Sequence, residues 1–246
     1  MVNGIKTSAA AMMAQGERLA VLTNNLANAS ATGFKADAVG FFQPLTSPRA
    51  AGSVSPTDPA APLTPPSFRT RIDLTAGAMQ DTGNALDLAL DGEGFFVLGD
   101  PEGLRLTRAG SFTRTRAGLL AAPDGAPVLD TGQQPIRLPE RGAIVVDDAG
   151  AVSVDGRPVA RLLIASAPAD RLVRQGGVRF ALPEGVAPTP LAGARVRQGV
   201  LEASNVNPVL TLVEMIDALR VYEAAQRATH GIDETLRRAV NDVGRP

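Results

Sequence analysis

The 246-residue chain is 44% hydrophobic and 20% charged, which is enough apolar sequence for one large or two small domains with a buried core. Its net charge of −1 and its isoelectric point near 5.9 give no electrostatic reason to expect a nucleic acid or an anionic membrane surface as a partner. Because the chain has no cysteine, disulfides, thiolate metal sites and iron–sulfur clusters are excluded.

The N-terminal segment predicts an amphipathic helix over about residues 4–27. One apolar stripe recurs every seven residues, with two further apolar residues beside it: Ile5, Met12, Leu19 and Leu26, then Ala9 and Leu22. The segment has one lysine and no continuous apolar run, and Glu17-Arg18 interrupts it, so it does not resemble a cleavable secretory signal. No run in the chain reaches the length of a transmembrane helix. If the chain is exported, another route must carry it.

A proline-rich segment follows. Seven prolines lie between about residues 43 and 67, in the run QPLTSPRAAGSVSPTDPAAPLTPPS, and this excludes regular helix and central strand. We therefore assign residues 1–42 to the first helix and the motif after it, and residues 43–83 to a Pro-rich extended linker.

Residues 84–201 predict an all-β domain. Short strand-like runs are separated by Gly, Asp and Pro turns: LDLAL, GFFVL, LRLTR, SFTRTR, AIVVDD, VARLLIAS and VRFAL. Three dipeptides resemble hairpin corners: Ala109-Gly110, Ala149-Gly150 and Asp155-Gly156. We expect many short antiparallel strands here.

Residues 202–246 predict a second long helix, which begins at Asn207-Pro208 because proline favours a first helical turn and asparagine can cap it. A heptad seam follows, formed by Met215, Tyr222, Thr229, Leu236 and Val243 with Ala218, Ala225, Ile232 and Ala239. The expected fold class is α+β, in which the two terminal helices pair as a coiled-coil-like stalk and the all-β domain is inserted between them.

No catalytic constellation is found in the sequence. His230 is the one histidine, and a helix-surface position is the better interpretation, since no G-x-S-x-G elbow accompanies it. The run from Asp87 to Leu98 resembles a calcium loop but has leucine where the bidentate glutamate belongs. Gly92-Glu93-Gly94 lacks the third glycine of a dinucleotide site, so we interpret residues 91–94 as a turn. We expect no enzyme activity, no cofactor, no metal and no small-molecule substrate.

Four arginines gather in the run LRLTRAGSFTRTR: Arg105, Arg108, Arg114 and Arg116. They are candidates for a phosphate site or an acidic partner, but alternating arginines on an exposed hairpin are more often solvated. The solvated interpretation is favoured.

Two distant runs carry a specific resemblance. NNLANASATGFK, from Asn24 to Lys35, resembles the N-terminal motif of bacterial flagellar basal-body rod and hook proteins. QGVLEASNVN, from Gln198 to Asn207, followed by Met215-Ile216, Arg220 and Tyr222-Glu223, is similar to their second hallmark. The central GNALDLALDGEGFFVL and LTRAGSFTRTRAGLL are similar to the start of their β domain. The resemblance spans the chain except its Pro-rich segment.

The residues of the first motif also have a physical interpretation. Leu26 closes the apolar stripe, and Asn24, Asn25 and Asn28 tolerate turn or left-handed geometry where the helix ends. Gly33 allows a backbone conformation that other residues avoid, and Phe34 can anchor the returning chain on an apolar surface. Lys35 is expected to be solvated or to pair with a neighbour. The predicted assembly motif is Asn24, Asn25, Leu26, Ala27, Asn28, Gly33, Phe34, Lys35, Glu202, Ser204, Asn205 and Val206.

The resemblance implies a structural subunit of the flagellar rod, whose terminal helices pack with those of other rod subunits and of its own copies around an axial channel, with the β domain outside. It implies export through the flagellar type III apparatus, assembly in the periplasm and transmission of torque from motor to hook. The predicted helix interface comprises Leu19, Leu22, Leu26, Met215, Leu219 and Tyr222. The proximal-rod member fits best and the distal-rod member next. A different class also stays open, an envelope β-rich binding module with a helical oligomerisation stalk.

Overall fold

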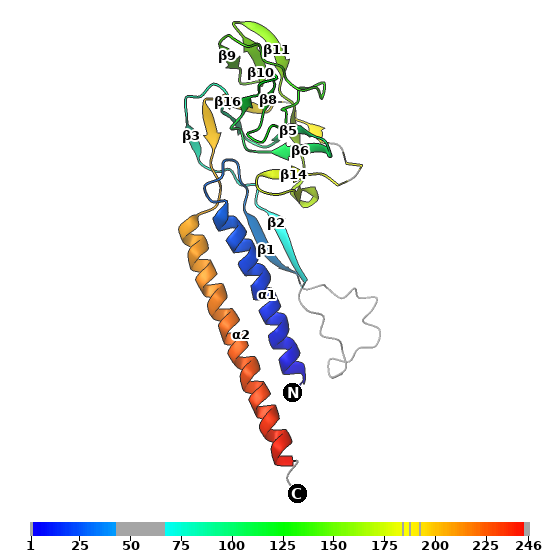
Figure 1. Cartoon of the computed structure of the whole chain (residues 1–246), viewed down its shortest axis with the longest axis vertical. Coiled ribbons are helices and arrows are strands. Elements are labelled where there is room, and N and C mark those ends of the chain that lie inside the picture. Colours follow the sequence, from blue (N-terminus) through cyan, green and yellow to red (C-terminus); the bar gives the residue numbers. More distant parts are fainter. Residues whose placement is uncertain (1, 43–66, 184, 187, 192, 244–246) are drawn as a thin grey trace. The chain divides into compact units, whose positions relative to one another are not determined.

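The computed structural model describes residues 2–42, 67–183, 185–186, 188–191 and 193–243 (Figure 1). The chain divides into two compact units. The helical unit contains residues 1–26, 37–71 and 208–246, and the β unit contains residues 27–36 and 72–207. These units divide the chain at other positions than the boundaries 42/43, 83/84 and 201/202 expected from the sequence. The Pro-rich run at 43–66 lies outside the described residues.

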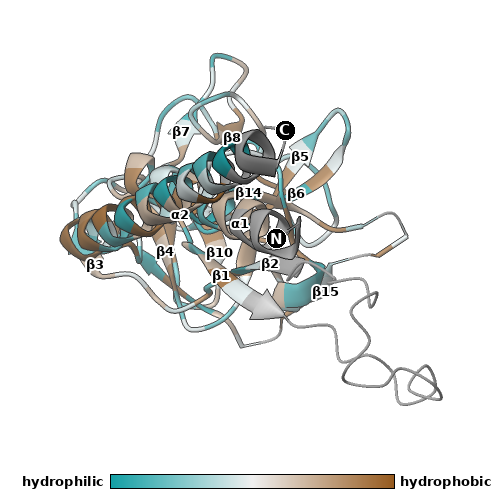
Figure 2. Ribbon diagram, turned by 90° about the horizontal axis from the view of Figure 1, so that it is seen from below, coloured by the Kyte–Doolittle hydropathy of each residue, from teal (hydrophilic) through white to brown (hydrophobic). Residues whose placement is uncertain are grey.

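Within the described residues, the helical unit contains two helices and one pair of strands. Helix α1 (Val2–Ala27) and helix α2 (Pro208–Val243) lie side by side and run in opposite directions, so both chain ends are at the same end of this unit (Figures 1 and 2). Strand β1 (Asp37–Phe42) pairs with β2 (Ser67–Ile72) on the other side of α1 from α2. The two helices confirm the elements predicted at the chain ends, including the start of α2 after Asn207.

One side of α2 is less exposed than the rest of the helix. Thr211 and Ala218 are buried, with exposed fractions of 7% and 0%, and the half-buried positions continue this side at Met215, Tyr222, Ala225, Thr229 and Ile232. From Met215 onward these are the positions of the predicted heptad seam. On α1, Ala14 and Leu22 are buried. The two helices therefore pack against each other, whereas their pairing as a coiled-coil-like stalk stays a prediction.

The β unit consists of short antiparallel strands, as the sequence predicts. The largest sheet has the order β13-β14-β6-β5-β12-β15, formed by β5 (Phe95–Asp100), β6 (Gly103–Thr107), β12 (Ile164–Ser166), β13 (Val173–Arg174), β14 (Arg179–Ala181) and β15 (Thr189–Pro190). A three-stranded sheet has the order β11-β10-β9, formed by β9 (Ile144–Val146), β10 (Ala151–Val154) and β11 (Arg157–Arg161).

Three two-stranded ladders complete the β unit. They pair β16 (Arg195–Gln198) with β4 (Leu88–Asp91), β17 (Val200–Glu202) with β3 (Met79–Asp81), and β7 (Thr113–Arg114) with β8 (Leu120–Ala121). A single 3-10 turn, η1, covers Ala169–Arg171. Because β16 and β17 pair with β4 and β3, the C-terminal end of this unit is hydrogen-bonded to its beginning.

Two of the three predicted hairpin corners are confirmed. Ala149-Gly150 joins the paired strands β9 and β10, and Asp155-Gly156 joins β10 and β11 with φ of 50° and 77°, as a tight hairpin turn requires. Ala109-Gly110 is not a hairpin corner, because β6 and β7 do not pair. A side chain at Gly110 would collide with the carbonyl oxygen of Leu88, so this glycine permits a close approach of two chain segments instead.

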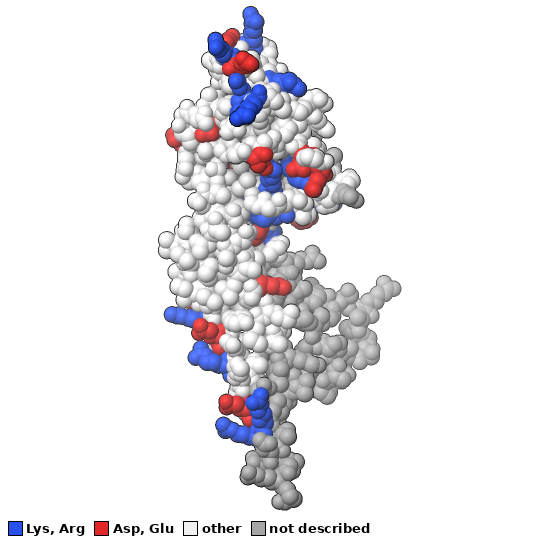
Figure 3. Space-filling model, in the orientation of Figure 1, with Lys and Arg blue, Asp and Glu red and all other residues white. Residues whose placement is uncertain are grey.

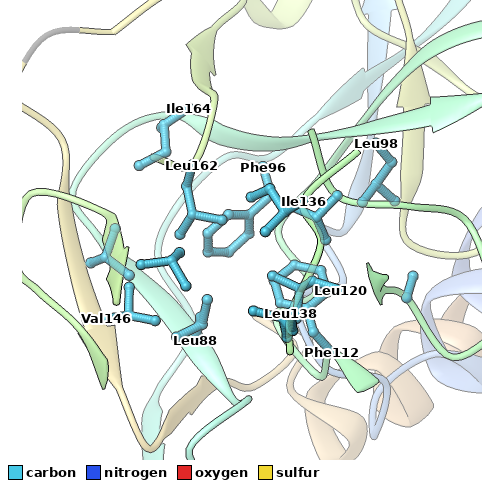
Figure 4. Packing of buried hydrophobic residues seen from close by; sticks show 14 of the residues in the cluster. Leu88, Phe96, Leu98, Phe112, Leu120, Ile136, Leu138, Val146, Leu162 and Ile164 are labelled. Carbon is cyan, nitrogen blue, oxygen red and sulfur yellow. The ribbon is translucent and has the colours of Figure 1, made fainter. Parts of the chain in front are cut away.

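Strand β5 is buried on both faces, and its alternating side chains enter two apolar clusters. Phe96 and Leu98 enter the first, where the Phe96 and Phe112 rings meet edge to face with centroids 5.2 Å apart (Figure 4). Phe95 and Val97 enter the second, together with Phe180. Each fully buried phenylalanine contributes about 1.5–3 kcal/mol to folding. These clusters give the β unit a core of its own.

Candidate functional site

The two sequence motifs that carry the resemblance meet inside the β unit. The Gly33 amide donates to the Glu202 carbonyl at 2.7 Å, and the Asn205 amide donates to the Phe34 carbonyl at 3.3 Å. The Ala36 amide donates to Oδ1 of Asn205 at 2.8 Å. We call this place the motif junction: residues 33–36, 73–77 and 202–205, with Arg108 and Arg174. The chain folds back here so that its first and last motifs share one hydrogen-bond network.

Lys35 and Glu202 form a buried ion pair at the centre of the motif junction. Lys35 Nζ lies 2.5 Å from Glu202 Oε1, and both side chains have an exposed fraction of 0%. Lys35 also donates to the Thr75 carbonyl at 2.7 Å, and Glu202 Oε1 accepts the Gly77 amide at 3.0 Å. Lys35 was expected to be either solvated or paired with a neighbour. Solvation is wrong, because Lys35 is buried and pairs with Glu202 of the same chain.

Arg108 is the second cation at this carboxylate. Its Nη1 donates to Glu202 Oε2 and to the Leu90 carbonyl, both at 3.3 Å, and Nη2 donates to the Gly92 carbonyl at 2.6 Å. Nε has no hydrogen-bond partner among the described residues. The guanidinium carbon lies 5.6 Å from the centroid of the Phe95 ring. One carboxylate thus pairs with two buried cations.

The predicted solvation of the arginine cluster is half wrong. Arg114 and Arg116 are exposed, whereas Arg105 and Arg108 have exposed fractions of 8% and 6%. Arg105 donates to Glu102 at 2.9 Å. The predicted exposed hairpin is also wrong, because β6 and β7 do not pair and residues 105–108 are all buried.

Burial sets the direction of both pKa shifts in the junction. Desolvation lowers the pKa of the Lys35 ammonium from its usual 10.5, while the adjacent Glu202 carboxylate opposes that shift. Desolvation likewise lowers the pKa of Arg108, again opposed by Glu202. Desolvation is the largest influence on both groups, and the Glu202 carboxylate opposes it in each case.

Gly33 and Phe34 fit the roles that the sequence suggests. Gly33 has φ of 67°, and a Cβ there would lie 2.3 Å from the Ala109 nitrogen, so only glycine fits. Phe34 is fully buried, and the guanidinium carbon of Arg174 lies 4.6 Å from its ring centroid. Nη2 of Arg174 also donates to the Lys35 carbonyl at 2.5 Å. Sequence reasoning assigned Arg108 to a solvated cluster and missed Arg174, and no local signal marks either residue as buried.

Of the three asparagines in the first motif, Asn28 lies in the turn after α1, as expected, whereas Asn24 and Asn25 lie within the helix. No asparagine in the described part of the chain has a positive φ; Gly33 supplies the left-handed turn. Asn25, in the helical unit, donates to the Asp37 carbonyl at 2.8 Å and accepts the Asp37 amide at 2.9 Å, which fastens strand β1 to the end of α1. Asn24 donates to the Asp37 carboxylate at 3.5 Å. The carbonyl of Asn28 accepts the Ala31 amide.

The other predicted assembly residues are spread over both units. Asn205 Nδ2 donates to the Asp73 and Thr75 carbonyls at 3.0 and 3.2 Å, and Ser204 Oγ accepts the Val206 amide at 3.2 Å. In the helices Leu22 is buried and Ala27 is exposed, while Leu219 is 43% exposed. The remaining positions are half-buried: Leu19, Leu26, Met215, Tyr222 and Val206.

Three protein-family models match the chain. Residues 5–35 match the model described as flagella basal body rod protein, residues 89–154 match the flagellar hook protein FlgE/F/G D1 domain, and residues 197–242 match the flagellar basal body rod FlgEFG protein C-terminal model. The first and third of these matches contain Lys35 and Glu202, the two partners of the buried pair.

Curated relatives match over the full length. The chain is 32% identical to the flagellar basal-body rod protein FlgF of Caulobacter vibrioides, over 100% of this chain and 99% of the relative. It is 30% identical to FlgF of Escherichia coli over 97% of both chains, and 29% identical to the rod protein FlgG of Bacillus subtilis over 91% of this chain and 92% of the relative. The chain therefore belongs to the flagellar basal-body rod protein family and is a structural subunit of the rod in the flagellar basal body.

Proposed function

We propose that this chain is the proximal-rod subunit, and that it assembles with copies of itself and with other rod subunits. The supporting observation is the full-length similarity to FlgF, at 32% identity, with relatives named FlgG matching at 29%. Since a distal-rod protein is also similar over most of its length, the position in the rod needs a direct test.

The helices supply the assembly surfaces in this proposal. α1 and α2 continue their packing across subunits as coiled-coil layers around an axial channel. The contacts include Leu19, Leu22, Leu26, Met215, Leu219 and Tyr222. Leu219 is the most exposed of these side chains and is available to a neighbour without any rearrangement. Shared helix contacts distribute a torsional load over many buried side chains, as torque transmission from motor to hook requires.

The motif junction has the second role, which is to fasten the chain segments that carry this load. Residues 27–36, 72–77 and 202–207 adjoin positions where the chain passes from one compact unit to the other. The Lys35–Glu202 pair, together with Arg108 and Asn205, ties these segments to one another. In this proposal the task of the junction is mechanical, and the chain carries out no reaction and needs no cofactor.

The route to the rod completes the proposal. The subunit leaves the cytoplasm through the flagellar export apparatus without a cleavable signal peptide and assembles in the periplasm. No helix within the described residues combines the length and apolarity needed to cross a lipid bilayer. A secretion assay tests the route: the full-length protein should leave wild-type cells but stay inside cells that lack the flagellar export apparatus.

An in-frame deletion tests the function itself. Electron microscopy of basal bodies from the deletion strain should show rings with a short or absent rod and no hook, and plasmid expression should restore both. A stub without a complete proximal rod indicates the proximal position, whereas a stub with a complete proximal rod indicates the distal one. Complete basal bodies and normal swimming in the deletion strain would refute the proposal.

A further inference from the structure

Helix α2 carries an apolar surface that its own chain leaves exposed. Leu212, Val213, Ile216 and Leu219 have exposed fractions of 46%, 50%, 51% and 43%. Their spacing places them on one face of the helix, beside the half-buried Met215 and away from the buried Thr211 and Ala218. We call these four residues the α2 outer face. Figure 2 shows that the N-terminal end of α2 is strongly hydrophobic. Contiguous exposed apolar side chains on a soluble protein mark an interaction surface.

The α2 outer face ends after Leu219. Farther along the same side of the helix the exposed residues are polar or charged: Glu223, Arg227, His230 and Glu234. Figure 3 shows the corresponding change, with acidic and basic atoms over the later part of α2. An apolar contact that excludes water is therefore confined to the first turns of α2. The partner's apolar surface must be short enough to fit these turns.

Helix α1 carries a strip of matching length. Met13, Gly16, Ala20 and Thr23 are exposed and are spaced by three, four and three residues, so they form one stripe that we call the α1 outer face. A Cβ at Gly16 would meet nothing within 4 Å, so nothing in the chain itself requires a glycine there, although glycine weakens a helix interior. The Thr23 hydroxyl donates to the Leu19 carbonyl at 2.7 Å, so it needs no other partner.

The two outer faces are complementary in size and charge. When the helices run in opposite directions, Thr23, Ala20 and Gly16 come opposite Leu212, Ile216 and Leu219, so each large side chain faces a small one. The first and last residues of each set are seven positions apart, so the two sets have the same length along their helices. The next residues, Glu17 and Arg220, are both exposed and fall on the same edge, where their charges are opposite.

We propose that the outer face of α2 packs against the outer face of α1 in a second copy of this chain. The inference rests on the proposed rod function and names the contact between copies. Because the two faces are different surfaces, the contact is head to tail, and each copy keeps one face open for the next. The contact therefore builds an open series of copies instead of a closed pair.

Disulfide crosslinking tests the contact directly, because the natural chain has no cysteine. Ala20→Cys and Ile216→Cys are introduced singly and together into the deletion strain, and isolated basal bodies are oxidised and run on non-reducing gels. The double variant should give a ladder of dimers, trimers and larger species, and neither single variant should crosslink. Dimers from Ile216→Cys alone would indicate contact between two α2 helices and would overturn the proposal, as would assembled rods without crosslinks or with crosslinks only to a different protein.

Gly16→Leu provides a test that does not depend on crosslinking. The isolated subunit should fold normally because the added side chain has open space, but the rod should fail to form because the neighbouring α2 cannot approach. Gly231→Leu is the matched control: Gly231 also lies in open space in α2, but among charged residues, and motility should persist. Normal rods with Gly16→Leu, or equal loss of rods in both variants, would overturn the contact. Complete basal bodies in the deletion strain would instead refute the rod function itself.

Discussion

Replacing Glu202 by glutamine should destabilise the β unit strongly. The carboxylate accepts hydrogen bonds from Lys35, Gly77 and Arg108 and is the anion between two buried cations. A glutamine of the same shape keeps one acceptor oxygen but places an NH2 group against a donor. Removing one partner of a buried ion pair costs about 3–5 kcal/mol, mostly because the remaining charge is left uncompensated. We expect a loss of this size in the free energy of unfolding.

The matched control is Glu102→Gln. Glu102 also binds an arginine, Arg105, at 2.9 Å, but its side chain is 79% exposed. Exposed ion pairs contribute at most about 1 kcal/mol because water and salt screen them. Both variants therefore remove one carboxylate charge that is paired with arginine, but only Glu202 is buried and has further donors in Lys35 and Gly77.

Urea unfolding followed by amide NMR signals of the β unit, such as those of Val97 and Leu106, measures both variants. Aromatic fluorescence is unsuitable because the chain has no tryptophan and its single tyrosine, Tyr222, lies on α2. If Glu202→Gln loses no more stability than Glu102→Gln, the buried carboxylate does not hold the network together, and the reasoning about the motif junction is wrong.

Three further predictions concern other parts of the site. Gly33→Ala should destabilise the β unit several times more than Gly83→Ala in the same urea assay; both have φ near 70°, so each incurs about 1–2 kcal/mol of backbone strain, but only at Gly33 would the Cβ collide with backbone atoms. Burial lowers the pKa of Lys35, so at pH values between its folded-state pKa and 10.5 the unfolded chain binds more protons than the folded chain. The free energy of unfolding of the β unit should therefore rise with pH in that window. Lys35→Met should lack this rise. Asn25→Ala removes both hydrogen bonds to the Asp37 main chain and should cost about 1–3 kcal/mol, with faster hydrogen exchange at the Asp37 amide, whereas Asn25→Asp, which keeps the acceptor, should lose less.

The sequence predicts what is periodic or local. The apolar stripes predict both helices, the Asn207-Pro208 start predicts the first residue of α2, and Asp155-Gly156 predicts a tight turn. The sequence does not predict that Gly110 lets the chain approach the Leu88 backbone closely. A glycine before a polar run has the same local pattern as a glycine in a turn. The local pattern cannot distinguish a glycine in a hairpin turn from a glycine at a close contact between two chain segments.

The motif junction exposes the same limit more sharply. Lys35 and Glu202 are each recognisable within a motif, yet their pairing depends on the fold bringing two distant segments together. Arg108 belongs to an alternating run in which Arg116 is exposed, and only the position of Glu202 in the fold decides that Arg108 is buried. Tertiary neighbours, which no local window contains, determine which charges lose their water.

The separation of Lys35 from Glu202 also orders the folding of the chain. They are 167 residues apart, and closing a flexible loop of that length costs about 4–5 kcal/mol of entropy before any contact compensates it. A chain synthesised from its N-terminus presents Lys35 long before Glu202 exists, and strands β3 and β4 likewise wait for β17 and β16. The β unit of a nascent or truncated subunit therefore stays open along one side, and it closes only when its last strands arrive.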